Sequence, residues 1–233
     1  MSCSNASTLL ACMLVFHGGC SQSRDYAKLL TELKSETPMV RANAACLLGR
    51  YYSQGTLDHA EGIPSTELVV DSLIANIDDE DEVVRLKTAE ALGNIGSKAK
   101  PAVRALIRRL EKENTHRSYY LSAFQGIGRT AKEAIPIITS FANDNDGTVR
   151  ASALSALSAV DRGSDATIDI LTQALSDPQT GVRQRAATEL GNQRPVRPMV
   201  IQALEKTVRM DNEHVGNSAK QALESIRSAK DTH

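Results

Sequence analysis

The chain has 233 residues, of which 41% are hydrophobic and only 3% are aromatic, and it contains no Trp. This composition excludes a thick, aromatic-rich core and favours stacked helices that pack through Ala and Leu. The formal net charge of −1 excludes a global field that would draw the protein to nucleic acid or to anionic lipid.

Residues 1–23 differ from the rest of the chain. Leu9–Phe16 is an apolar run of eight residues, which is too short for a bilayer span of about twenty but has the length of the apolar region of a secretory signal. Small residues lead to Cys20, and polar residues follow. This order resembles a bacterial lipoprotein signal, and the resemblance implies a lipid on Cys20 and a place on the periplasmic side of the cell envelope. The alternative is a tail without a signal, which would leave the protein in the cytoplasm.

Beyond this tail, one arginine recurs at a nearly fixed interval. The series is Arg41, Arg85, Arg117, Arg150 and Arg183, with Gly216 in the next position. The intervals are 32 or 33 residues, except for the first, which is 44. A period of this length indicates an array of helical hairpins. We expect the extra residues of the first interval in a connector over Ser53–Gly62.

Each arginine lies at the start of a predicted helix, with apolar residues following at steps of three and four. A second helix follows in each repeat, and in most repeats a proline stands near its start, where the missing N–H costs nothing. These prolines are Pro64, Pro101, Pro136 and Pro198. With a leading helix near Tyr26–Leu33, the pattern predicts eleven or twelve helices over residues 24–233, in about five and a half repeats.

Acidic residues precede most of the arginines at constant offsets. The pairs six and four residues upstream are Asp79 and Asp81, Glu111 and Glu113, and Asp144 and Asp146, while Asp177 precedes Arg183 by six. We expect the nearer acid to cap the helix. A cation in the first turn opposes the helix dipole, so each arginine needs a fixed acceptor in its own or the next repeat. We therefore predict a structural ladder of Arg41, Arg85, Arg117, Arg150 and Arg183 with acids that include Asp79, Asp144 and Asp177. The alternative is a row of arginines that binds phosphates.

The repeated segments resemble HEAT repeats, in particular the short HEAT-like repeats first associated with phycobilisome lyases. The residues that carry the resemblance are Asp144, Asp146, Val149, Arg150, Leu154 and Leu157, with matching runs that begin at Asp79 and Asp177. The resemblance covers about residues 37–229. It implies an all-α, right-handed α-solenoid of stacked antiparallel helix pairs that serves as a non-catalytic protein-protein interaction scaffold. A bilin lyase-like enzyme or lyase subunit, and a nucleic-acid-binding HEAT-like protein, remain as alternatives.

The strongest local charge asymmetry lies in the second helix of the second repeat. Arg104, Arg108 and Lys112 form one row at 3.6 residues per turn, and Arg109 lies beside it. In HEAT arrays the second helices line the concave side, so this basic row is a candidate surface for a partner. The alternative is an ordinary solvated helix face.

No catalytic or metal-binding pattern occurs in the sequence. The histidines form no His-x-x-x-His arrangement and the cysteines no Cys-x-x-Cys arrangement. We therefore expect neither a cofactor nor enzymatic activity. The expected partners are another protein and, through Cys20, a lipid bilayer, while nucleic acid is not favoured.

Overall fold

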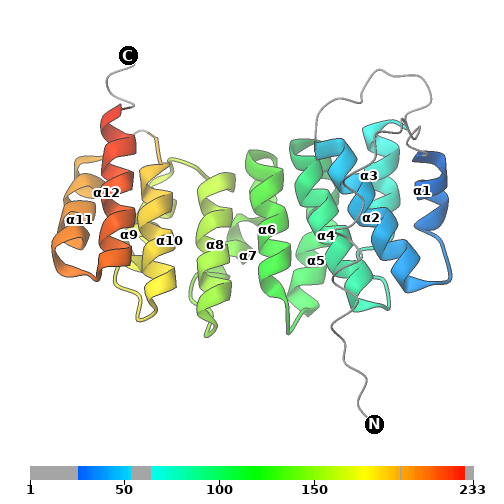
Figure 1. Cartoon of the computed structure of the whole chain (residues 1–233), viewed down its shortest axis with the longest axis horizontal. Coiled ribbons are helices and arrows are strands. Elements are labelled where there is room, and N and C mark those ends of the chain that lie inside the picture. The colour runs from blue at the N-terminus through cyan, green and yellow to red at the C-terminus, as the bar shows by residue number, and fades with distance from the viewer. Residues whose placement is uncertain (1–25, 54–63, 195, 229–233) are drawn as a thin grey trace, which may run out of the picture.

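The computed structural model describes residues 26–53, 64–194 and 196–228 (Figure 1). Within these ranges the chain forms helices and turns and no strand, which confirms the prediction of an all-α solenoid. The α-helices and two 3₁₀ segments are α1 (Tyr26–Glu32), α2 (Pro38–Ser53), α3 (Thr66–Ile74), α4 (Glu82–Ile95), η1 (Gly96–Ala102), α5 (Val103–Lys112), α6 (Arg117–Ile127), η2 (Gly128–Ala134), α7 (Ile135–Phe141), α8 (Gly147–Val160), α9 (Asp165–Ala174), α10 (Thr180–Gly191), α11 (Pro198–Met210) and α12 (Glu213–Ser228).

The helices form two rows that run the length of the array. The first helices of the repeats, α2, α4, α6, α8, α10 and α12, stand side by side, each in contact with the next (Figure 1). The second helices, α3, α5, α7, α9 and α11, form the other row, and α1 packs on α2 at the start of the array. The connector predicted over Ser53–Gly62 falls almost wholly on residues 54–63, outside the described part of the chain.

Small residues set the spacing within the row of first helices. A Cβ added to Gly126 on α6 would lie 2.3 Å from the carbonyl oxygen of Gly93 on α4, and one added to Gly49 would lie 2.4 Å from Cα of Ala91. Backbones this close exclude any side chain at these positions. Gly96 and Gly128, in contrast, end α4 and α6 with φ of 74° and 66°, a backbone conformation that favours glycine.

The apolar core has a polar seam between α8 and α10. One cluster of buried apolar side chains extends from Tyr26 to Val160 and a second from Leu154 to Ile226. Between α8 and α10, Ser155 donates to Glu189 at 3.0 Å, and Gln193 donates to Ser158 at 2.8 Å. All four side chains are buried and hydrogen-bonded. The polar groups of the seam are therefore satisfied within the protein, as buried polar groups usually are.

Candidate functional site

Three of the recurring arginines hold the first acid of the next repeat with two parallel hydrogen bonds. Nε and Nη2 of Arg41 donate to Asp79 at 2.8 Å each, and the same atoms of Arg150 donate to Asp177 at 2.7 and 2.8 Å. Arg183 donates to Asp211 at 2.6 and 2.9 Å. This fork geometry is the strongest form of the arginine–carboxylate bond, so each such pair, called a rung here, joins one repeat to the next.

The third nitrogen of each of these guanidinium groups, Nη1, donates to the loop that precedes the arginine's own helix. In Arg150 it donates to the carbonyl oxygens of Asp144 at 2.8 Å and Asn145 at 3.1 Å, six and five residues upstream. Arg41 and Arg183 repeat this pattern. The arginine therefore satisfies loop carbonyls and the neighbouring acid together, which explains a cation in the first turn of a helix despite the helix dipole.

The rungs make stability depend on pH. Hydrogen bonds from Arg150 lower the pKa of Asp177, although burial raises it, and bonds from Arg183 do the same for Asp211. A carboxylate whose pKa is lower in the folded state contributes stability above its unfolded pKa, about 4, and loses it as the pH falls through the folded pKa. We expect the free energy of unfolding, measured by urea titration with circular dichroism, to fall below about pH 4. A value that stays constant down to pH 2 would contradict the contribution of these rungs.

Two of the arginines depart from this geometry. Arg117 makes a single bond to Asp144, from Nη1 at 3.0 Å, and its Nε donates to the carbonyl of Glu113. Arg85 donates from Nη1 to the carbonyls of Asp79 and Glu80, but within the described residues its buried Nε has no partner and no acidic side chain accepts from it. The prediction of an Arg85 rung to an acidic side chain is therefore wrong.

The cause is a shorter loop before α6. The carboxylate of Glu113 accepts from the N–H of Thr115, two residues on, as Asp79 does from Asp81. Glu113 therefore takes the structural position that the sequence offsets assigned to Glu111, and four residues instead of six separate it from Arg117. Its carboxylate is occupied by Arg109, at 2.9 Å, so none is left for Arg85.

Tyr120 contacts Glu113, the acid in the position of the missing rung. Its side chain is fully buried, and its hydroxyl lies 3.5 Å from Glu113. It stands three residues after Arg117, where the other repeats have Ala44, Thr88, Ala153 or Ala186. A tyrosine at an alanine position is the sequence signal that could have revealed the interruption.

The predicted caps form only in part. The side chain of Asp81 accepts from the N–H of Val84, and that of Asp146 from Thr148. In contrast, α6 begins after His116, whose side chain makes no capping bond, and Gln179 makes none for α10.

The four members of the basic row all lie on α5, but they are not equivalent. Arg109 is half-buried and ion-paired with Glu113, so it belongs to the interior instead of a free surface. Arg104 is exposed and pairs with Glu133 at 2.7 Å. Arg108 and Lys112 are exposed, and they are the members of the row whose charge is open to a ligand.

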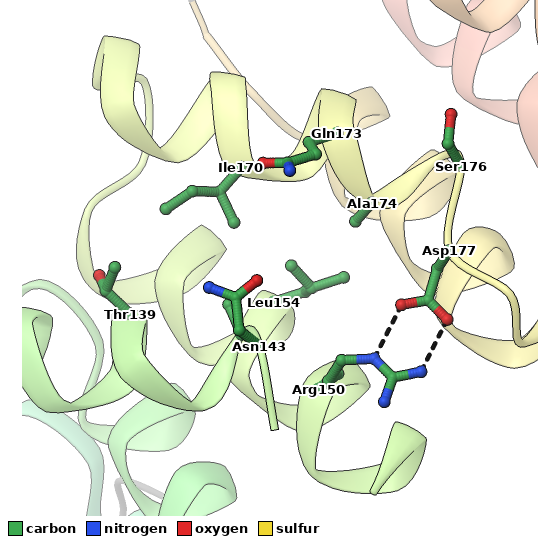
Figure 2. A pocket seen from close by; sticks show the side chains of 10 residues that line it. Thr139, Asn143, Arg150, Leu154, Ile170, Gln173, Ala174, Ser176 and Asp177 are labelled. Atoms are coloured by element: carbon green, nitrogen blue, oxygen red, sulfur yellow. Dashed lines mark hydrogen bonds and ion pairs between the residues drawn. The ribbon is translucent and has the colours of Figure 1, made fainter. Parts of the chain in front are cut away.

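A cavity of about 290 Å³ lies between the second helices α7 and α9 (Figure 2). Its apolar surface comes from Ala142, Leu154, Ile170 and Ala174, and the rung of Arg150 and Asp177 closes one end. Figure 2 shows the amide of Asn143 directed into the cavity. A side-chain amide offers both a donor and an acceptor at the edge of this apolar cleft.

A second cleft, of about 340 Å³, lies one repeat further on, between α9 and α11. Its lining residues Thr172, Ala203 and Lys206 stand 33 residues after Thr139, Ile170 and Gln173 of the first cleft. The rung acid Asp211 lines it, as Asp177 lines the first. The clefts therefore repeat with the period of the array, and sequence analysis did not predict them.

Other kinds of site find no support in the described part of the chain. There, no group of three His, Cys, Asp or Glu side chains could hold a metal ion. No helix in these ranges is long and apolar enough to cross a membrane. Cys20 and the whole N-terminal tail lie outside the described residues.

Comparison with known proteins agrees with this architecture. The family model for HEAT repeats matches residues 26–118 and 115–191. The chain is similar to a designed armadillo repeat protein solved with the peptide (KR)4, with 19% identity, 88% of this chain and 100% of that one covered and a TM-score of 0.63. It is also similar to an archaeal HEAT-like repeats protein from Thermococcus onnurineus NA1, with 16% identity, 87% of each chain covered and a TM-score of 0.54. A comparison with curated proteins gave no match. Since the family model covers well over half of the sequence, the chain belongs to the HEAT repeat family.

Proposed function

We propose that the protein is a non-catalytic scaffold that binds an extended segment of another protein along its second helices. The observation that carries this proposal is the repetition of the same cleft between α7 and α9 and between α9 and α11. An extended peptide repeats its backbone groups at a constant rise, so a periodic row of clefts suits it better than it suits a single small molecule. Solenoids offer such extended surfaces in general.

The chemistry of the clefts supports a peptide. Ala142, Ala174 and Ile170 provide apolar contact in the first cleft, while Asn143 and Gln173 provide amides that can pair with a peptide backbone. The designed armadillo repeat protein that shares the fold was solved with a bound peptide, which makes peptide binding an expectation for this architecture.

We expect the cleft amides to contribute directly to affinity. A double substitution, Asn143→Ala with Gln173→Ala, should weaken binding of peptides selected from a displayed library about tenfold or more, because the backbone groups of the peptide lose their partners. Fluorescence anisotropy with a selected peptide measures the change. Gln184→Ala with Thr188→Ala, which alters exposed polar side chains on the first helix α10, is the matched control. Equal loss in both variants, or in neither, would rule out the clefts as the binding surface.

The two exposed cations of the basic row suggest that one segment of the partner is negatively charged. Arg108 and Lys112 lie on α5, in the same row of second helices as the clefts. A partner that continues along this row toward α5 would meet them with an acidic segment. Reversal of both charges should then lower the association rate constant and change the dissociation rate constant little. An unchanged association rate constant would show that α5 is not part of the binding surface.

The second part of the proposal is a lipid anchor on Cys20, which would hold the scaffold at the periplasmic face of a membrane. The support is the order of apolar run, small residues and Cys20. A single acyl chain binds a bilayer only weakly, so a stable anchor needs more than one. Mass spectrometry of the N-terminal peptide of the mature protein tests this. A lipid-modified Cys20 supports the anchor, and an unmodified chain that begins at Met1 refutes it.

A further inference from the structure

The two long edges of the array carry opposite charge, although the net charge of the chain is close to zero. One edge holds the loops between repeats, with exposed Glu36, Asp78, Glu80 and Glu82. The other edge holds the turns within repeats, where each first helix ends and each second helix begins. The exposed cations on this second edge, called the basic edge here, are Arg50, Lys100, Arg129, Lys132, Arg162 and Arg227.

Most of the described carboxylates on the basic edge already bind an arginine or hydroxyl group of the same chain. Glu133 pairs with Arg104, Asp165 pairs with Arg197, and Asp161 accepts from the hydroxyls of Ser164 and Thr167. Glu67, in the first turn of α3, is an exposed acid on this edge. The six cations, in contrast, extend from α2 to α12 and have no ion pair within the described ranges.

Helix electrostatics explain only part of the sign of this edge. Arg50 and Arg227 lie in the last turns of α2 and α12, where the negative end of the helix dipole favours a cation. Neither α5 nor α7 has an acidic residue in its first turn, where the dipole would favour one. Lys100 and Lys132 lie in the 3₁₀ segments that lead into these helices. A cation at the start of a helix gains nothing from the helix dipole, so the helices that follow Lys100 and Lys132 do not explain these two lysines.

We propose that the basic edge binds the surface of an anionic lipid bilayer. The edge is long and open: Figure 1 shows the ends of the first helices along one side of the array (the upper side in this view). Six first helices packed at about 8–10 Å place these cations along roughly 50 Å. Charges within about 10 Å of a bilayer surface act on it at physiological salt, and a long row of them fits an extended anionic surface better than a single small ligand.

The start of α1 lies on the same edge. The ring of Tyr26, the first residue of α1, packs against Tyr51 and Tyr52 near the end of α2, so α1 begins at the basic edge. Tyr26 stands six positions after Cys20, which allows at most about 20 Å of chain between them. A lipid on Cys20 would therefore hold the basic edge against the membrane and turn the acidic edge away. This orientation rests on the proposed anchor, whereas the binding of the edge to anionic lipid does not.

The test uses the full chain with Cys20→Ser, so that no lipid contributes. Co-sedimentation compares vesicles of neutral phosphatidylcholine with vesicles that contain phosphatidylglycerol, and the ratio of the two affinities cancels any contribution of the apolar run Leu9–Phe16. The triple variant Arg129→Glu, Lys132→Glu and Arg162→Glu removes cations from the centre of the edge. The matched control reverses three exposed cations elsewhere, Lys34→Glu, Arg209→Glu and Lys220→Glu.

Each cation near an anionic surface strengthens binding by about fivefold, so we expect the triple variant to lose at least tenfold in the anionic-to-neutral ratio, while the control stays within about twofold. Circular dichroism confirms that both variants are folded. Equal binding by the triple variant and its parent, or a parent with no preference for anionic vesicles, would overturn the proposal. So would tighter binding of the parent to a DNA duplex than to the vesicles, because the edge would then be a nucleic-acid surface. An unmodified Cys20 in the mature protein would refute the anchor and leave this result unaffected.

Discussion

Replacement of Arg150 by Leu should destabilise the protein by about 3 kcal/mol. The side chains of Arg150 and Asp177 are only 11% and 10% exposed, and they share two hydrogen bonds. Removal of one partner leaves the other charge buried and unpaired, a change that costs about 3–5 kcal/mol in proteins. The substitution also leaves the carbonyls of Asp144 and Asn145 without their donor. For a chain of this length the melting temperature should fall by about 6–12 °C.

The matched control for this prediction is Arg162→Leu. Arg162 is exposed in the turn between α8 and α9, so its loss should change the free energy of unfolding by less than about 0.5 kcal/mol. Thermal melts of both variants, followed by circular dichroism at pH 7, compare them. If Arg150→Leu and the parent protein have the same melting temperature, the rung does not stabilise the fold. If it melts with the parent and also loses peptide binding, the arginines belong to a binding row instead of the scaffold.

Replacement of Gly126 by Ala should destabilise the protein by about 2–3 kcal/mol, although Ala is the better helix former. The new Cβ would lie 2.3 Å from the carbonyl oxygen and 2.9 Å from Cα of Gly93. These are backbone atoms of the neighbouring helix, so no side chain can move aside, and α4 and α6 must separate. Overpacking of this kind costs about 1–3 kcal/mol, beyond the helix-propensity gain that Ala brings.

Gly181→Ala, in contrast, should raise the free energy of unfolding. An added Cβ at Gly181, near the start of α10, meets no atom within 4 Å. Its replacement by Ala should therefore stabilise the protein by about 0.4–1 kcal/mol, mainly by restricting the unfolded chain. Chemical denaturation of the two variants side by side checks both signs. Stabilisation by both substitutions would mean that α4 and α6 do not approach as closely as described.

The fold could be predicted because the sequence repeats the same local signals. The interval of 32 or 33 residues, the apolar stripe after each arginine and the prolines near the second helices all favour the same hairpin array. Even the leading helix, predicted at Tyr26–Leu33, is found at Tyr26–Glu32. Local signals suffice here since each repeat contacts mainly its neighbours.

The ladder could be predicted only in outline. The offsets in the sequence do not show whether each arginine binds the acid of its own repeat or that of the next, because this depends on how the repeats stack. The last rung acid, Asp211, was missed since it belongs to a repeat in which Gly216 replaces the arginine. In the repeat after Arg85, Glu111 stands at the offset of the other rung acids, while the shorter loop puts Glu113 in that place.

The clefts and the basic edge could not be read from the sequence. Each cleft combines side chains of successive repeats, such as Asn143 from the end of α7 and Gln173 from α9. The basic edge collects cations from different repeats, and the net charge of −1 gives no sign of it. Both become visible only after the helices have been placed.

Site-specific photo-crosslinking in cells that produce the protein is the most direct test of the scaffold with its binding surface on the second helices. A benzophenone amino acid is placed at Gln173 or at Lys206, one in each cleft, and for comparison at Thr188, on the first helix α10. The proposed function predicts that Gln173 and Lys206 crosslink to the same protein and that Thr188 does not. Crosslinks from Thr188 with none from either cleft position would contradict it.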